Sequence, residues 1–413
     1  MHKEANHAKV GWRLVALSLA TGVLAACSHP VTTEAKASES WDPKAAAVYL
    51  DQREVIWMAW QGAARDHGTF CVSCHTAVPY ALSRPALRKA LAEDALSVNE
   101  RKLLDNVTKR VQLWNEIAPF YVGEGYNSAK PAESRGTEAV LNALILASYD
   151  EQDGHLSDTT RAAFRNMWAL QQTGGGGKGA WSWLQFGMEP FEAKDSQYYG
   201  AAFAAIAVGI APENYRSTPE IQEKLSMLRE YLNREYATQS TMNHAVLLWA
   251  STKLPGLLDP ERQRSIIKEV SDEQQADGGW KLSPLAWPND WSLHSFVRTR
   301  WRSDGTRQDW RSDGYATALI TFALQQAGMS AEDARLRRGL SWLARNQNRL
   351  EGFWPSFSLA KHRDPSSNVG HFMDDAATGY AVLALSRSNI AQGKGEVTAR
   401  ISLSANRPDP EKK

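Results

Sequence analysis

Cysteine is scarce in this chain of 413 residues, which contains three: Cys27, Cys71 and Cys74. Three cysteines are too few for the dense disulfide framework that supports a small secreted domain. They also exclude a four-cysteine zinc site, and the set Cys71, Cys74 and His75 leaves a tetrahedral zinc site one ligand short. No zinc is therefore expected.

The chain also lacks an excess of charge of either sign. Lys and Arg number 47 against 46 Asp and Glu, which gives a formal net charge of +1. Without a strongly basic balance, nucleic acid is not an expected partner. Beyond residue 27 no apolar run is long enough to cross a bilayer, so a permanent transmembrane helix is not expected.

The N-terminal segment has the order of an export signal: basic residues, the apolar run Leu14 to Leu24, and small residues before Cys27. Leu24-Ala25-Ala26-Cys27 resembles the bacterial lipoprotein box, which predicts a signal peptide over 1–26 and lipidation of Cys27. Ser28 takes the place of the Asp that often signals retention at the inner membrane. The polar segment 27–41 reads as a disordered tether. We expect a periplasm-facing envelope lipoprotein whose partner is the lipid membrane, at the outer membrane rather than the inner.

Cys71, Cys74 and His75 form a Cys-x-x-Cys-His motif. This spacing attaches a c-type haem, because each thiol can add to a vinyl group while the imidazole reaches the iron. The motif predicts one haem c held by Cys71 and Cys74, with His75 as an axial ligand. The alternative is a redox dithiol or a disulfide, because thiols near a helix N-terminus have lowered pKa values.

A haem iron has a second axial position, which Met, His or no side chain fills. Met188, His371 and Met373 are the candidates, because all three fall in long turns between helices. A filled position favours electron transfer to a partner protein, and a vacant one favours chemistry on a small molecule.

A turn pattern recurs along the chain: Gln, a variable turn, Gly, one residue and an aromatic. Its copies begin at the four glutamines Gln61, Gln172, Gln274 and Gln347. A helix-compatible stretch precedes each copy, and an Ala/Leu-rich stretch follows it. The repeat therefore predicts consecutive helical hairpins.

The copy at Gln347 with Gly352 and Trp354 closely resembles the QW motif of the squalene–hopene cyclase and terpenoid-cyclase/protein-prenyltransferase superfamily. The resemblance implies an all-α fold, a single α/α toroid in which an inner ring of helices is wrapped by an outer ring. We expect the toroid over 42–390 and a disordered tail over 391–413. The six expected outer and inner helix pairs are 44–62/78–91, 97–115/134–148, 158–172/196–208, 219–235/240–251, 260–275/314–326 and 332–347/375–386.

Four acids precede the inner helices at equivalent positions, so all four should lie at one mouth of the ring: Glu133, Asp195, Asp313 and Asp374. Acids at helix starts cap backbone N–H groups and complement the helix dipole. The resemblance to the cyclases implies a second possibility, in which such an acid protonates a substrate. The family's Asp-x-Asp-Asp motif and its Asp-Asp-x-x-Asp metal motif are absent, so no magnesium is expected.

The fifth hairpin carries an insertion from Leu282 to Asp313 that contains four Trp and five Arg. A loop of this length inside a domain is often a lid or a binding segment. A flap held by Arg–Trp stacking is the structural alternative. We expect it to lie over the same mouth as the acids.

Three functions remain open from the sequence. The first is a haem protein acting in electron transfer or redox chemistry on a small or apolar ligand in the toroid mouth, as a haem-dependent oxidoreductase if it is an enzyme. The second is a terpenoid cyclase-like isomerase or lyase, or an isoprenoid-binding protein, with a catalytic acid and a structural disulfide. The third is a non-catalytic binding scaffold.

Overall fold

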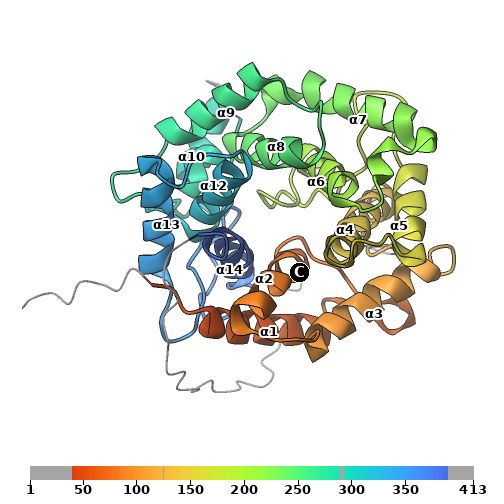
Figure 1. The fold of residues 1–413 in the computed structure, drawn as a ribbon, viewed down its shortest axis with the longest axis horizontal. Helices are drawn as coiled ribbons and strands as arrows, with labels where there is room; N and C mark the ends of the chain where they lie inside the picture. The colour runs from red at the N-terminus through yellow and green to blue at the C-terminus, as the bar shows by residue number, and fades with distance from the viewer. Residues whose placement is uncertain (1–39, 124, 289–292, 389–413) are drawn as a thin grey trace, which may run out of the picture. The chain divides into compact units, whose positions relative to one another are not determined.

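Six inner helices surround a common centre, and six outer helices wrap them (Figure 1). The computed structural model describes residues 40–123, 125–288 and 293–388. The inner helices are α2 (Ala77–Leu91), α4 (Lys130–Asp153), α6 (Ser196–Ile210), α8 (Thr241–Lys253), α12 (Gly314–Gln326) and α14 (Phe372–Leu385). The outer helices are α1 (Pro43–Ala59), α3 (Val98–Gln112), α5 (Asp158–Ala169), α7 (Gln222–Arg234), α9 (Pro260–Asp272) and α13 (Ala334–Asn346). The predicted all-α toroid of six hairpins is confirmed.

Contacts run around the inner ring in chain order, and α14 closes the ring against α2. The remaining described elements are short. They are the strands β1 (Ala64–Arg65) and β2 (Thr69–Phe70), the helices α10 (Leu282–Leu285) and α11 (Leu293–Arg300), and the 3-10 turns Asp66–Gly68, Tyr215–Ser217, Pro219–Ile221 and Tyr236–Thr238. No helix among the described residues is long and apolar enough to cross a membrane. The predicted signal peptide, Cys27, most of the tether and the C-terminal tail lie outside the described residues.

Small residues let the inner helices approach their neighbours closely. A Cβ atom at Gly200 would lie 2.2 Å from Cε3 of Trp183, and one at Gly136 would lie 2.1 Å from the carbonyl oxygen of Ser182. Neither position has room for a larger residue, since interiors are packed to crystal density. Gly136 of α4 and Gly200 of α6 are therefore required where the turn between α5 and α6 packs against these two helices.

Three buried or half-buried glutamines tie each hairpin to the next outer helix. Each side-chain amide donates 2.9 Å hydrogen bonds both to a glycine carbonyl of its own turn and to a carbonyl near the start of the following outer helix. The three are Gln171 (to Gly179 and Lys224), Gln274 (to Gly278 and Arg335) and Gln347 (to Gly352 and Asp42). Gln347 thereby joins the last hairpin to the first helix and closes the outer ring.

Of the four glutamines predicted from the repeat, Gln274 and Gln347 are confirmed, whereas Gln61 and Gln172 are wrong. In the third hairpin the bridging residue is Gln171, one position before the predicted Gln172. In the first hairpin Gln61 lies exposed in the turn, and Asn106 of α3 holds the backbone of Phe70 instead. The turn lengths of these two copies differ from those of Gln274 and Gln347, which shifts the residue that can reach both carbonyls.

Candidate functional site at the ring mouth

The Cys-x-x-Cys-His motif forms the turn that leads from β2 into the inner helix α2. Ser73 Oγ accepts hydrogen bonds from the backbone N–H groups of Thr76 and Ala77 at 3.2 and 3.0 Å, which starts the helix. The indole of Trp57 donates to the carbonyl of Cys71 at 2.7 Å. The motif therefore lies at the N-terminal end of an inner helix, as predicted.

Both cysteines of the motif are buried and free, with 5% of Cys71 and 2% of Cys74 exposed. Burial raises the pKa of the Cys71 thiol to about 12 and that of Cys74 well above its usual range. A helix N-terminus alone would lower these values, but loss of solvation outweighs that effect here. The thiols are neutral at physiological pH, which is opposite to the requirement for a reactive dithiol.

Burial of both sulfur atoms also bears on the predicted haem. A porphyrin bonded to two thiols needs open space beside both, and this structure contains protein atoms there. The Cys71 and Cys74 side chains as arranged here do not fit the group.

His75 is held in one tautomer by a chain of hydrogen bonds. Its Nδ1 lies 2.8 Å from Thr76 Oγ1, and that hydroxyl donates to Asp375 Oδ2 at 2.7 Å. Because the single hydroxyl proton goes to the carboxylate, Thr76 accepts from Nδ1–H and Nε2 is left unprotonated. Burial lowers the pKa of His75 to about 3, so the ring is neutral. It stacks on Phe372 with ring centroids 4.0 Å apart.

The three candidates for a second axial ligand have other surroundings. His371 Nδ1 lies 2.9 Å from Asp374 Oδ2. Met373 is buried in the core, and Met188 lies on the surface with 38% exposed. Within 40–123, 125–288 and 293–388, no group of three or more His, Cys, Asp or Glu side chains could hold a metal ion.

Asp313 and Asp374 lie at the same end of the ring and share one partner. Ser356 Oγ donates to the Asp313 carboxyl group at 2.9 Å, and the Ser356 backbone N–H donates to Asp374 Oδ1 at 2.8 Å. Asp313 also accepts from the backbone of Ala316 at 3.0 Å, as the N-cap of α12. Burial raises the pKa of Asp313 to about 7. Hydrogen bonds occupy both carboxyl groups, which indicates a structural role.

Asp375 is fully buried beside these acids and is paired with Arg53. The Arg53 Nε and Nη2 atoms lie 2.7 and 3.1 Å from the two oxygens of Asp375, and Tyr49 donates a further hydrogen bond at 2.8 Å. This cluster orients Thr76 and, through it, His75.

Glu54 directly follows Arg53 in α1. It is buried, and neither of its carboxyl oxygens has a hydrogen-bond partner in the described structure. Burial, and then the negative charges of Asp375 and Asp51, raise its pKa to about 8. The folded state therefore binds the proton more tightly than the unfolded chain does. The resulting stabilisation is complete below the ordinary pKa of 4.5 and is lost as the pH rises through about 8.

Replacing Glu54 by Gln should remove this pH dependence, because the amide keeps the shape of the protonated acid and cannot ionise. We expect the wild type to lose about 1.4 kcal/mol of stability for each pH unit between its unfolded pKa of 4.5 and its folded pKa of about 8, and the variant, which has no such loss, to be the more stable protein at pH 9. Urea unfolding at pH 6 and pH 9 measures the difference. The exposed Glu220, changed to Gln, is the control, and equal stability of the Glu54 variant and the wild type at pH 9 would contradict the assignment.

The turn between α5 and α6 carries three acids at a spacing of three residues: Glu189, Glu192 and Asp195. Its backbone is fixed by hydrogen bonds from Phe186 N to Glu192 O at 2.7 Å and from Glu192 N to Met188 O at 2.8 Å. Burial raises the pKa of all three acids. The turn therefore presents carboxyl groups with a raised affinity for protons at the ring mouth.

Glu192 stands out among the three. Burial raises its pKa to about 7, against the positive charges of Lys130 and Arg65. Its side chain is half-buried, and no described residue donates a hydrogen bond to its carboxyl oxygens. In contrast, Glu189 binds Arg298 at 3.0 Å, and Asp195 lies 3.4 Å from the amide of Asn243.

Glu133 is the second carboxyl group near Lys130. The Lys130 ammonium lies 2.5 Å from Glu133 Oε2 and donates to the carbonyl of Gln185 at 2.6 Å. The backbone N–H of Gln185 lies 3.3 Å from the same Glu133 oxygen. A buried ammonium and an amide donor both stabilise the anion. Lys130 thus pairs with Glu133 and lies close enough to Glu192 for its charge to act on that acid.

Aromatic side chains adjoin this pair. Tyr121 packs edge-on against Phe186 and Tyr126, with ring centroids 5.0 and 5.3 Å apart. Tyr121 is close enough to Glu192 and Cys71 for their charges to raise its pKa, although burial is the main cause. Tyr126 is 45% exposed. The mouth therefore combines two acids with a partly exposed aromatic surface.

The insertion lies at this end of the ring. Arg298 of α11 binds Glu189, and Pro288 forms a β-bridge with Ser240 at the start of α8. Ser303 binds the backbone of Ala360 in the turn before α14. These contacts place the insertion over the inner-helix N-termini, as predicted.

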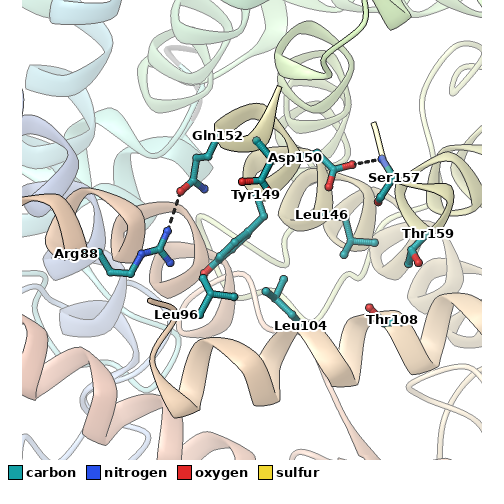
Figure 2. Close-up of a pocket in the computed structure, with 11 residues that line it drawn as sticks. Arg88, Leu96, Leu104, Thr108, Leu146, Tyr149, Asp150, Gln152, Ser157 and Thr159 are labelled. Atoms are coloured by element: carbon teal, nitrogen blue, oxygen red, sulfur yellow. Dashed lines mark hydrogen bonds between the residues drawn. The ribbon is translucent and has the colours of Figure 1, made fainter. Parts of the chain in front are cut away.

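A separate cavity of about 310 Å³ lies between α2, α3, α4 and α5 (Figure 2). Its residues from α4 are Leu146 to Asp153, some 16 or more positions beyond Lys130, so it is at the other end of the ring. Arg88 there binds Glu100 and Gln152, and Asp150 accepts from the backbone of Ser157. Internal partners satisfy these groups, so this cavity offers no catalytic pair.

No family model matches the chain, and no curated protein matches it. Among solved structures, an inactive variant of an α-1,6-mannanase of Salegentibacter sp., bound to α-1,6-mannotriose, matches with a TM-score of 0.49 and 11% identity. The match covers 84% of this chain and 100% of the mannanase. A wild-type glycosidase matches with a TM-score of 0.46 and 13% identity, over 83% of this chain and 97% of that one. Identities this low concern the arrangement of helices alone.

Two predictions from the sequence are corrected here. The predicted relationship to terpenoid cyclases and c-type cytochromes is wrong, since the matched structures are glycosidases. The predicted haem-based redox function is wrong with it, and the burial of both thiols agrees with this correction. The cyclase-like and scaffold alternatives gain no support. Glu192 and Lys130 were not among the residues predicted from the sequence. For Glu192 the regular spacing of acids in the α5–α6 turn was the available signal, and for Lys130 there was none.

Proposed function

We propose that the chain is a glycoside hydrolase that cleaves its substrate at the ring mouth, with Glu192 as general acid and Glu133 as its carboxylate partner. The observation that carries the proposal is the pair itself: one acid whose pKa burial raises to about 7, and one carboxyl group paired with the Lys130 ammonium. Glycosidic cleavage requires this combination, because one group must donate a proton while the other acts as an anion.

In the proposed reaction Glu192 donates its proton to the leaving oxygen as the bond from that oxygen to the anomeric carbon breaks. Water then attacks the anomeric carbon and Glu133 takes its proton, or Glu133 attacks directly and water displaces it in a second step. The anomeric configuration of the first product distinguishes the two routes. In both routes the Lys130 ammonium pairs with the Glu133 carboxyl group and holds it in position.

The aromatic surface beside the acids suits a sugar substrate. Tyr121, Phe186 and Tyr126 present ring faces and edges that can pack against the C–H groups of a pyranose. The Glu189–Arg298 contact fixes the insertion next to the acids, where it can limit access of water.

The test is release of reducing ends from a panel of neutral and acidic polysaccharides by the full chain. We expect at least one substrate to be cleaved, and cleavage to be lost in the Glu133→Gln variant and in the Glu192→Gln variant. Circular dichroism of each variant controls for folding. A folded wild-type protein that cleaves no member of the panel would contradict the proposal.

We also propose that the chain is exported and anchored in the envelope membrane through lipidated Cys27. The segment that carries this proposal lies outside the described residues, and its support is the order of basic, apolar and small residues before Cys27. Replacing Cys27 by Ser should abolish incorporation of labelled palmitate and release the protein from the membrane fraction. Unchanged labelling of that variant would refute the anchor.

A further inference from the structure

The insertion contains a small cavity whose walls are two indoles and two guanidinium groups. Its volume is about 300 Å³, and the residues that line it are Arg300, Trp301, Arg307 and Trp310. This size lies at the lower end of the roughly 300–1,000 Å³ found for ligand pockets. Both tryptophans are unusually exposed, 41% for Trp301 and 43% for Trp310.

The two arginines have no carboxylate partner among the described residues. Arg300 stacks over Phe296 at 3.7 Å and lies 5.7 Å from the ring of Trp310, and Arg307 lies 5.0 Å from the ring of Trp301. The nearby acids are already occupied: Asp309 pairs with Arg311 at 2.7 Å, and Asp304 accepts from Thr306 at 2.7 Å. The cavity therefore has a positive charge that the described side chains do not neutralise.

The frame of the cavity is held in place, so the groups are arranged before any ligand arrives. Trp301 and Arg307 face each other across a β-bridge, and the backbone N–H of Gln308 donates to Arg300 O at 2.9 Å. Arg302 anchors the hairpin by donating to the carbonyl of Ser358 at 2.7 Å. A fixed frame lowers the entropy cost of binding.

We propose that this cavity binds an acidic sugar unit of the polysaccharide on which the ring mouth acts. The indole faces would stack on the sugar ring, while Arg300 and Arg307 would bind its carboxylate or sulfate group through guanidinium forks. Arg298, two residues before Arg300 in α11, binds Glu189 of the mouth turn, so the segment that forms the cavity also contacts the turn that carries Glu192. The inference rests on the proposed hydrolase function and adds the substrate class.

A concave site of this size favours a sugar over a membrane surface, because a bilayer is contacted by protruding apolar side chains. Two of the four lining residues are arginines, which could also bind the headgroups of anionic lipids. Binding to an anionic lipid surface is therefore one of the outcomes of the test below.

The experiment is calorimetric titration of the Glu192→Gln protein, which binds without turnover. The three probes are a carboxylated oligogalacturonate, a sulfated oligogalactose and a neutral mannotriose. We expect an acidic probe to bind at least tenfold more tightly than the neutral one, with the carboxylated and sulfated arms showing which anion is preferred. Trp310→Ala and Arg300→Gln should each weaken that binding about tenfold or more, whereas the matched control Arg311→Gln, whose arginine is paired with Asp309, should not.

Equal affinity for the neutral and acidic probes, or acidic binding that survives both cavity variants, would overturn the inference. Sedimentation with vesicles of neutral and anionic phospholipid provides the other arm. Vesicle binding that Trp310→Ala abolishes, in a protein that binds no acidic sugar, would assign the cavity to a lipid surface and overturn the inference as well. Hydrolysis of a neutral polysaccharide by the wild type would leave the proposed function intact while removing the acidic substrate class.

Discussion

Replacing Glu192 by Gln should lower kcat by about 10²–10⁴-fold while changing KM little, because the amide occupies the same space and has no proton to donate. The expectation follows from the pKa of Glu192, which burial raises to about 7. At neutral pH a large fraction of this group is protonated, which an exposed glutamic acid is not. Initial rates of reducing-end release across substrate concentrations measure both constants.

Glu189 offers a matched control for this variant, since it lies in the same turn and is also a buried acid. In Glu189→Gln the amide oxygen can still accept the hydrogen bond from Arg298. We expect this protein to keep most of its kcat. A similar fall in both variants would mean that the turn has been disturbed, and an active Glu192→Gln enzyme would remove Glu192 from the mechanism.

Replacing Arg53 by Met should cost about 3–5 kcal/mol of the free energy of unfolding. Asp375 is 0% exposed, and Arg53 is the cation that contacts both of its oxygens. Without that cation the carboxylate must stay charged in the core or take up a proton, and either change destabilises the folded state. The midpoint of urea unfolding at pH 7, with its slope, measures the loss.

Two further proteins isolate the cause. Arg53→Met combined with Asp375→Asn removes both charges, and we expect it to recover a good part of the lost stability. Arg335 binds Asp333 on the surface at 3.1 Å with 44% of its side chain exposed, so Arg335→Met should change stability by less than about 1 kcal/mol. Equal effects of Arg53→Met and Arg335→Met would contradict the account of the buried pair.

The fold could be predicted from the sequence because its signals are local and repeated. Gln274 and Gln347 each sit a few residues before a Gly and a Trp, and in the structure their amides make the contacts that the repeat implies. The predicted bridging residue is wrong at Gln172 and Gln61, because longer turns there change which side chain reaches the next helix. Turn length is a three-dimensional constraint that a short motif does not encode.

The site was less predictable, because its chemistry depends on burial. The sequence placed Cys71, Cys74 and His75 at the ring mouth, but their pKa values follow from contacts with residues far along the chain. His75 is oriented through Thr76 by Asp375, 300 positions away from His75 in sequence. Glu192 gains its raised pKa from burial in the folded α5–α6 turn, and the three-residue spacing of Glu189, Glu192 and Asp195 does not show which of the three lacks a partner.

The most direct test of the central claim is the pH dependence of kcat/KM on a cleaved polysaccharide. If Glu192 must be protonated in the free enzyme, kcat/KM should fall tenfold per pH unit above a midpoint near 7. Glu192 loses its proton above that midpoint, so the fall in kcat/KM must be on the alkaline side of the pH profile. A kcat/KM that stays constant from pH 6 to pH 9 would contradict the assignment of Glu192 as the general acid.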